Sequence, residues 1–363
     1  MIARQSADKP RTHAEEERHE SDKPPTLFHT ADNLSIIAQQ QRKCNTFFKY
    51  FFHLSKPSTK TVQNILIILS FCGRIILIIS IRLYFCPDRE ENNTVKKEEI
   101  VTLTLPYSPK RQKTVRVYIP AHEEGETFPV IYMTDGQNLF EEETTRFGSW
   151  LTHDAVKAEQ AQSGKAAIIV GIHNDGSPLE RNNDLTPKSI GKINGFLMKI
   201  LAFPSPDGES FARFVTEVVK PAVEKKFPVK TDRDNTAFCG SSSGGLMSFY
   251  MALTYPGIFS AAGVFSPAMI LYSEKDMSGW IRSRVSQANG LTNGQNMPFL
   301  YIYTGNGDKR EKDMFKGEQQ TYAVLKECYP NDLLKEVVIP DAMHNEGAWA
   351  PVFRDFLHFF LTR

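Results

Sequence analysis

Three consecutive serines stand between glycines in the stretch "FCGSSSGGLMSF", residues 238–249. An apolar run precedes the serines and a helix-like run follows them, so the stretch does not read as a flexible Ser/Gly linker. A phosphate-binding P-loop would need a lysine after the glycines, and none follows here. The remaining interpretation is a strand, a sharp turn and a helix with the pattern Gly-x-Ser-x-Gly, which presents a nucleophilic serine at the end of a strand.

Glycine spacing selects one of the three serines. The turn strains its central residue, so the positions two before and two after it must lack bulk. Gly240 and Gly244 flank Ser242 in this way, whereas frames centred on Ser241 or Ser243 place a cysteine or a serine where glycine is preferred. We therefore predict Ser242 as the nucleophile. The backbone N–H of Ser243, at the start of the following helix, is predicted to donate to the developing oxyanion.

A serine hydroxyl needs a general base, and around this kind of turn the acid and then the histidine follow the serine along the chain. Two histidines follow Ser242. His358 lies in the helical segment "FRDFLHFF", where a packing or surface role is the default. His344 follows the apolar run "EVVIPDAM" at a strand end and is predicted to be the base. His173, in "VGIHNDG", precedes the serine and is interpreted as either pocket lining or structural.

The acid that orients the histidine should lie between the two, just beyond a strand. The stretch "FLYIYTGNGDKREKD" offers Asp308, Glu311 and Asp313, each of which could instead belong to a solvated charged loop. Asp308 comes first, after a Gly-Asn-Gly turn that would aim it over the sheet edge, and it is the preferred acid. Glu311 is the alternative. Asp341, three residues before His344, is interpreted as a turn residue.

A second oxyanion donor is expected from the loop "MTDGQNLF". Gly136 would allow a close approach of the backbone, and the N–H of Gln137 is the predicted donor. The carboxylate of Asp135 would in one interpretation cap the backbone N–H groups of its own loop.

Strand-like and helix-like segments alternate from residue 98 onward. Two alternating runs around "PYSPKR" predict a hairpin, and short apolar runs such as "FPVIYMTDG" and "KAAIIVGI" are typical of buried parallel strands. Such alternation predicts an α/β fold with a mostly parallel central sheet covered by helices on both faces. Functional loops of such a sheet lie at the carboxyl ends of its strands, where each polar cluster of this sequence is found.

The first 97 residues have a different character. Residues 1–60 are polar and are expected to be disordered. Residues 61–86 contain the apolar run 64–85, which is long enough for a single transmembrane helix despite Arg74 near its centre. Upstream lysines and arginines would place the N-terminus in the cytoplasm and the catalytic domain outside; without insertion the chain is expected in the cytoplasm. Residues 87–97 form a linker, and residues 98–363 form the predicted catalytic domain.

Composition excludes several classes of function. A net charge of +1 among 363 residues gives no indication of nucleic-acid binding. The five cysteines are widely spaced and form neither a disulfide framework nor a metal-binding pattern. We therefore expect no metal and no cofactor.

Several blocks resemble the putative-esterase branch of the α/β-hydrolases, which includes enterochelin-esterase-like and feruloyl- and acetyl-esterase-like enzymes. These blocks are "VIYMTDGQNLF", "VGIHNDGSPLERNNDLTP", "CGSSSGGLMSFYMALTYPGIFSAAGVFSPA" and "HNEGAWAPVFRDFLHFFL". The resemblance implies an α/β-hydrolase fold, with Ser242 and His344 as nucleophile and base. It also implies that Trp150, Phe265, Trp349 and Arg181 lie near the substrate, together with Asp135.

The expected function is hydrolysis of a small-molecule carboxylic ester through an acyl-enzyme, the substrate being an acylated sugar or a siderophore-type ester. An acyltransferase to an alcohol acceptor is the alternative, because the family is similar to mycolyltransferases. A third interpretation, a non-catalytic binding module tethered to a membrane, is disfavoured by the intact serine, histidine and acid.

Overall fold

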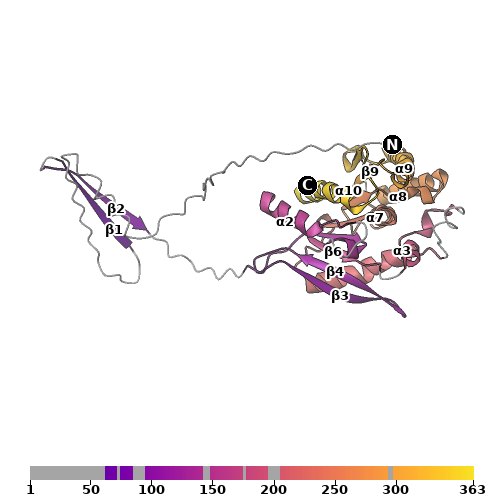
Figure 1. The fold of residues 1–363 in the computed structure, drawn as a ribbon, viewed down its shortest axis with the longest axis horizontal. Helices are drawn as coiled ribbons and strands as arrows, with labels where there is room; N and C mark the ends of the chain where they lie inside the picture. Colours follow the sequence, from indigo (N-terminus) through magenta and orange to yellow (C-terminus); the bar gives the residue numbers. More distant parts are fainter. Residues whose placement is uncertain are drawn as a thin grey trace, which may run out of the picture. The chain divides into compact units, whose positions relative to one another are not determined.

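The computed structural model describes residues 62–71, 74–84, 95–141, 148–174, 177–194, 205–292 and 297–363 (Figure 1). The chain divides into two compact units, Met1–Glu91 and Asn92–Arg363. The polar segment 1–60 that the sequence predicts to be disordered lies outside the described residues, as do residues 87–94 of the predicted linker.

The apolar run of the first unit forms two strands instead of the predicted transmembrane helix. Strand β1 (Val62–Phe71) pairs antiparallel with β2 (Arg74–Tyr84), with Val62 opposite Tyr84. The prediction of a helix over residues 64–85 is therefore wrong. The run is rich in isoleucine, and β-branched side chains favour strands over helices. Among the described residues, no helix combines the length and the apolar composition that crossing a bilayer requires.

The second unit is built on an eight-stranded sheet with the order β10-β9-β8-β7-β5-β6-β4-β3. The pairs from β10 through β5 to β6 are parallel, and β4 and β3 complete one edge in antiparallel orientation. The strands are β3 (Glu99–Ser108), β4 (Arg111–Ile119), β5 (Val130–Thr134), β6 (Ile168–Ile172), β7 (Thr236–Ser241), β8 (Ala261–Phe265), β9 (Phe299–Gly305) and β10 (Leu334–Ile339).

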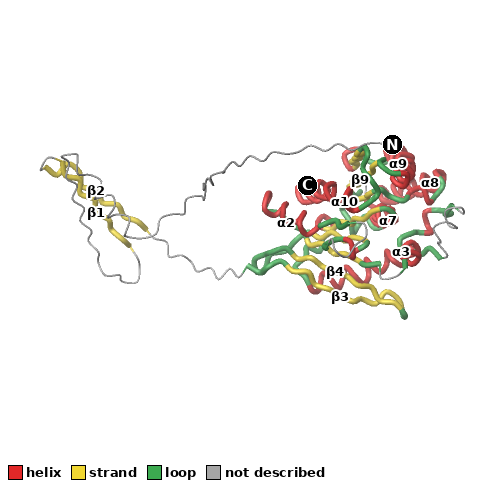
Figure 2. The backbone as a smooth tube through the Cα atoms, in the orientation of Figure 1, coloured by secondary structure: helices red, strands yellow, loops and turns green. Residues whose placement is uncertain are grey.

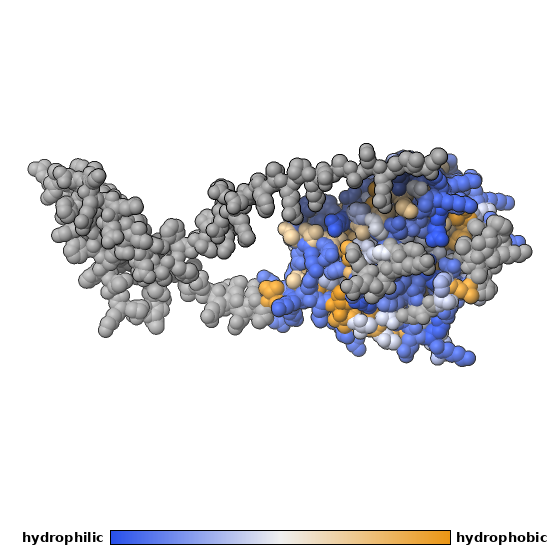
Figure 3. All heavy atoms as spheres, in the orientation of Figure 1, coloured by the Kyte–Doolittle hydropathy of each residue, from blue (hydrophilic) through white to orange (hydrophobic). Residues whose placement is uncertain are grey.

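Burial along the strands shows that both faces of the sheet are covered. Every residue of β5, β6, β7, β8 and β9 is buried, although successive side chains point to opposite faces. The edge strand β3 instead alternates between exposed and half-buried residues. In the view of Figure 3 the surface of this unit is mainly hydrophilic, with separate apolar patches.

Helices cover the sheet between successive strands (Figure 2). Helices α2 and α10 pack against one another, and α8 packs against both α7 and α9. The helices are α2 (Thr152–Ser163), α3 (Pro178–Asp184), α5 (Gly208–Arg213), α6 (Lys220–Lys226), α7 (Ser243–Thr254), α8 (Glu274–Thr292), α9 (Lys309–Cys328) and α10 (Glu346–Thr362). The π-helix η3 (Phe214–Val219) joins α5 to α6. The short 3-10 turns are η1 (Gly136–Asn138), η2 (Lys188–Ile190), η4 (Arg233–Asn235), η5 (Met269–Leu271) and η6 (Asn331–Leu333).

The carboxyl ends of the parallel strands meet at one edge of the sheet. The loops at that edge follow β5, β6, β7, β8, β9 and β10. Each loop contains a polar residue that the sequence predicts for the site, or a polar residue that hydrogen-bonds to such a residue. This edge is where an open sheet of this kind places its site.

Candidate active site

Ser242 occupies a sharp turn between β7 and α7. Its backbone has φ 59° and ψ −121°, a conformation that costs a non-glycine residue about 1–3 kcal/mol. Hydrogen bonds from neighbouring segments hold it there: Ser242 N–H donates to Phe265 O at 2.9 Å, and Ala268 N–H donates to Ser242 O at 3.0 Å. The strained turn and its supports therefore come from β7 and β8 together.

The glycines around this turn have no room for a side chain. A β-carbon on Gly240 or on Gly244 would overlap Thr134 Oγ1, and one on Gly244 would lie 3.4 Å from Asp135 Oδ2. A β-carbon on Gly245 would overlap Phe265 O. The packing against β5 thus explains why the Gly-x-Ser-x-Gly frame is centred on Ser242.

His344 and Glu311 form a buried pair. Glu311 Oε2 lies 2.5 Å from His344 Nδ1, and the side chains are 0% and 5% exposed. A carboxylate can only accept, so Nδ1 carries the proton and the other ring nitrogen, Nε2, is left as an acceptor. Glu311 Oε1 in turn accepts from Ser266 Oγ at 2.5 Å and from the N–H of Gly305 at 2.7 Å. Three groups from three segments of the chain therefore hold one carboxylate.

Asp308, the acid preferred from the sequence, does not contact the His344 ring in the hydrogen bonds of the described residues. It is the N-cap of α9, and its Oδ1 accepts from the N–H of Glu311 at 2.9 Å. Its Oδ2 accepts from the backbone N–H of His344 at 2.8 Å. Burial alone would raise the pKa of Asp308, but these backbone hydrogen bonds outweigh it and lower the pKa below its usual value. The structure therefore places Glu311, the alternative acid, against the His344 ring and places Asp308, the preferred one, against backbone N–H groups.

The loop that carries His344 is locked to the loop after β9. Gly307 N–H donates to Ala342 O at 2.8 Å, and Asp341 N–H donates to Asn306 Oδ1 at 2.9 Å. Asp341 has φ 60° and stands in a turn, as predicted. The two loops therefore hold His344 and Glu311 in one assembly.

The loop after β5 begins with a strained residue of its own. Asp135 has φ 55° and precedes η1, and a β-carbon on Gly136 would overlap the backbone of Gly171. The carboxylate of Asp135 accepts from Arg181 Nε at 2.6 Å and Nη2 at 2.7 Å, and from Asn174 Nδ2 at 2.9 Å. The capping role suggested by the sequence is therefore replaced by a buried bidentate ion pair. Gln137 Oε1 accepts from Asn174 N–H at 3.3 Å.

The predicted substrate-contacting aromatic residues belong to the core. Trp150, Phe265 and Trp349 are 3%, 0% and 4% exposed, which leaves almost no surface for a ligand. The two indoles stack at 5.6 Å between centroids, and Trp349 lies edge-on to His344 at 5.0 Å. Trp349 Nε1 also donates to Ser266 Oγ at 2.9 Å. Their burial does not fit the expectation that they line the pocket: Trp349 packs against His344 and bonds Ser266, and Trp150 and Phe265 pack behind it.

Sequence reasoning missed three residues that hold this site together. Ser266 is fully buried at φ 40° after β8, and nothing in "FSPA" marks it. Asn138 Nδ2 donates to Glu346 Oε1 at 2.8 Å, and both residues lie inside motifs that the family resemblance singles out, "DGQNLF" and "HNEGAW".

The sequence also draws attention to two histidines that it does not predict as the base, His358 and His173. His358 lies 3.1 Å from Glu159 on α2, and His173 lies beside Gly136.

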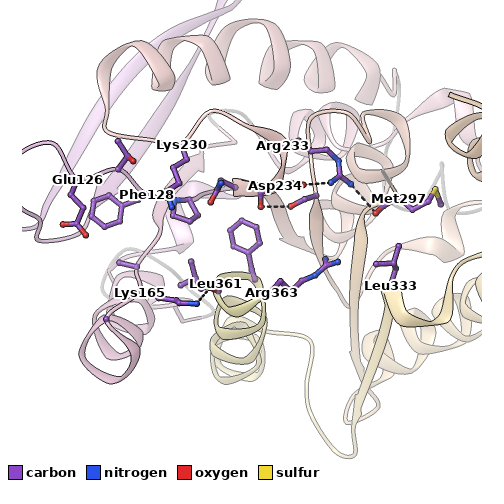
Figure 4. A pocket seen from close by; sticks show the side chains of 17 residues that line it. Glu126, Phe128, Lys165, Lys230, Arg233, Asp234, Met297, Leu333, Leu361 and Arg363 are labelled. Carbon is purple, nitrogen blue, oxygen red and sulfur yellow. Dashed lines mark hydrogen bonds and ion pairs between the residues drawn. The ribbon is translucent and has the colours of Figure 1, made fainter. Parts of the chain in front are cut away.

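A groove of about 720 Å³ lies at the opposite, amino edge of the sheet (Figure 4). Two of its basic side chains bond carbonyl groups of the fold. Lys165 Nζ donates to Leu361 O at the end of α10, and Arg233 donates to Pro256 O and pairs with Asp234. It contains none of the residues around Ser242, so it is not the active site. Within the described ranges no cluster of His, Cys, Asp or Glu is arranged to hold a metal.

Comparisons with known proteins identify the family of this chain. Residues 107–353 match the family described as "Putative esterase". An uncharacterized protein, YbbA of Bacillus subtilis (strain 168), is 22% identical over 232 residues, which cover 62% of this chain and 82% of the relative.

Two solved structures share the fold. The siderophore hydrolase EstB from Aspergillus nidulans is 21% identical, with a TM-score of 0.54 over 75% of this chain and 98% of that one. The feruloyl esterase module from Clostridium thermocellum, solved with sinapinate, is 18% identical, with a TM-score of 0.54 over 73% and 89%. The chain therefore belongs to the putative esterase family and is a carboxylic ester hydrolase with the α/β-hydrolase fold.

Proposed function

We propose that Ser242, His344 and Glu311 form a catalytic triad that cleaves carboxylic esters through an acyl-enzyme. The observation that carries this proposal is the hydrogen bond between the buried Glu311 carboxylate and His344 Nδ1, at the same sheet edge as the strained serine turn. A buried carboxylate at Nδ1 fixes the tautomer that leaves Nε2 able to accept a proton.

In the proposed first half-reaction, Ser242 Oγ attacks the ester carbonyl carbon and gives its proton to His344 Nε2. Glu311 stabilises the resulting imidazolium. The tetrahedral intermediate collapses, the bond to the alcohol oxygen breaks, and the imidazolium returns its proton to the leaving alkoxide. In the second half-reaction water attacks the acyl-serine by the same route and releases the acid.

We assign the oxyanion hole to the backbone N–H groups of Gln137 and Ser243. Ser243 is the first residue of α7, so the positive end of the helix dipole also favours the negative oxygen. Gln137 lies in η1, whose backbone is fixed by the close contact between Gly136 and Gly171. Because backbone donors held in this way need not reorganise during the reaction, they lower the barrier more than mobile side chains would.

Substitution of the triad tests this assignment. Ser242→Ala is expected to abolish hydrolysis of p-nitrophenyl acetate, and unchanged turnover would refute the nucleophile. Glu311→Gln is expected to lower kcat by up to about 10⁴-fold. Asp308→Asn is the matched control three residues away: it removes one acceptor oxygen from backbone N–H groups and none from the His344 ring, so its loss should appear in the melting temperature more than in kcat. A larger loss of kcat in Asp308→Asn than in Glu311→Gln would return the acid to Asp308.

For the substrate we propose an acylated sugar or a siderophore-type ester. This rests on relatives of the same fold whose names specify ferulate esters and siderophores. Measuring kcat/KM on an aryl acetate, a feruloyl sugar and a trilactone siderophore would test it. A preference for the simple aryl acetate over both larger esters would contradict the proposal.

A further inference from the structure

The loop of the proposed oxyanion donor is joined to the loop of the proposed base by a side-chain hydrogen bond. Asn138 Nδ2 donates to Glu346 Oε1 at 2.8 Å across 208 positions of sequence. Asn138 directly follows Gln137, and Glu346 stands two residues after His344. The bond therefore links two catalytic segments that come from opposite ends of the catalytic chain.

On one side, the backbone of Asn138 is fixed within its turn. Its N–H donates to Asp135 O at 2.8 Å, and its carbonyl accepts from the N–H of Trp150 at 2.9 Å and from Ser149 Oγ at 3.1 Å. The Asn138 side chain therefore projects from a backbone that its own turn holds, directly after the peptide of Gln137.

On the other side, Glu346 is the first residue of α10 and is 6% exposed. Asn345 caps this helix by accepting from the N–H of Ala348 at 3.0 Å. Burial raises the pKa of Glu346, an effect that the nearby Asp135 adds to and that the Asn138 amide and Arg181 oppose. The Asn138 amide is thus a donor that this buried carboxyl group needs, rather than an incidental surface contact.

We propose that Asn138 and Glu346 are positioning residues whose hydrogen bond sets the oxyanion loop against the loop of the general base. This inference rests on the proposed function, because it concerns the relative placement of two parts of that site. Neither side chain acts on the ester. Their effect is on the transition state, since a displacement of a catalytic donor by about 1 Å can cost up to about 10²-fold in rate.

Four single variants separate positioning from simple support. Asn138→Leu removes the donor and is expected to lower kcat on p-nitrophenyl acetate about 10- to 100-fold with KM little changed, since the oxyanion forms only in the transition state. Glu346→Leu should lower kcat by a similar factor. Glu346→Gln keeps an acceptor oxygen and should retain most of kcat. Asn138→Asp sets two carboxyl groups face to face. They can share one proton at low pH but repel each other when both ionise, so kcat should fall as pH rises above neutrality, where the wild-type enzyme stays flat.

A double variant tests whether restoring the hydrogen bond between positions 138 and 346 also restores kcat. In Asn138→Asp with Glu346→Gln, the introduced amide can donate to the introduced carboxylate, so the bond reforms with its direction reversed. This double variant should recover kcat relative to Asn138→Asp alone and should regain the flat profile at high pH. Asn235→Leu is the matched control, because Asn235 also donates its amide to a carboxylate, that of Asp232, near the amino edge of the sheet. Its kcat should equal that of the wild type.

The melting temperature of each variant decides among the outcomes. A loss of kcat that merely follows a loss of stability, with no change in pH profile and no rescue, would show a structural role and overturn the inference. Wild-type kcat in folded Asn138→Leu would overturn it as well. Failure of the proposed function is distinguishable, because it would appear as retained activity in Ser242→Ala whatever the Asn138 variants do.

Discussion

The buried carboxylate of Glu318 destabilises the folded protein when it is ionised, and one substitution can measure this effect. It lies on α9 with 1% exposure, and its Oε2 accepts from Gln319 Nε2 at 2.9 Å and Thr304 Oγ1 at 3.3 Å. Its Oε1 is buried and has no hydrogen-bond partner among the described residues. Burial is the main cause that raises the pKa of Glu318 from 4.5 to about 7, and the charge of Glu336 adds to it.

The sign and size of the effect follow from that pKa. Between about pH 4.5 and pH 7 the folded protein holds a proton on Glu318 that the unfolded chain has released, so the free energy of unfolding falls as pH rises through this window. The difference, 7 − 4.5 = 2.5 pH units, corresponds to about 3 kcal/mol at about 1.4 kcal/mol per unit. Glu318→Gln keeps the shape of the side chain and cannot ionise, so it should recover most of this energy at high pH.

Urea denaturation of the full chain, followed by tryptophan fluorescence at pH 5 and pH 8.5, measures this directly. Glu318→Gln should exceed the wild type by up to about 3 kcal/mol at pH 8.5, and the advantage should shrink towards zero at pH 5. Glu217→Gln, at an exposed glutamate, is the control and should change stability by less than about 0.5 kcal/mol at either pH. An advantage of the same size at both pH values, or none at pH 8.5, would refute the reasoning.

Three further predictions concern the site itself. Ser266→Ala removes a donor from the proposed triad acid, so kcat on p-nitrophenyl acetate should fall about tenfold while KM is retained; an unchanged kcat would contradict that support. Gly244→Ala drives a methyl group into Thr134, so urea denaturation should show that the free energy of unfolding falls by about 1–3 kcal/mol. An unchanged free energy of unfolding would mean that the turn can accommodate the methyl group. Arg181→Met leaves the buried charge of Asp135 without its cationic partner and should lower the free energy of unfolding by about 3–5 kcal/mol. The added Asp135→Asn change should restore most of this loss, and an additive double variant would refute the ion pair.

The parts of the site that depend on local spacing could be predicted from the sequence. The glycines two positions away on either side of Ser242 predict the turn from spacing, although the side chain that leaves them no room is Thr134 on β5. The buried strands were likewise evident from short apolar runs, and the expected α/β-hydrolase fold is confirmed. Composition gave a wrong prediction at residues 64–85. The length and apolar character of this run suit a transmembrane helix, but its isoleucines suit the observed strands.

Position beyond the strand does not choose between Asp308 and Glu311, because the two residues stand only three positions apart. The choice depends on where α9 begins. Since it begins at Lys309, Asp308 becomes the N-cap and Glu311 stands in the first turn. The pattern Asp-x-x-Glu before a helical run is a cap signature, and it would have indicated this arrangement. The supporting bond from Ser266 joins two loops and has no local signature.

Helix α9 carries two buried carboxylates, and only one of them has the surroundings that the proposed triad requires. Glu311 and Glu318 are both almost fully buried on this helix, two turns apart. Glu311 stands in the first turn, where the helix dipole favours negative charge, and it meets a hydroxyl, a backbone N–H and an imidazole. Glu318 stands beyond the reach of that dipole, with donors at one oxygen only. A buried carboxylate can hold an imidazolium only where donors replace the water it has lost, and on α9 that condition is met at Glu311.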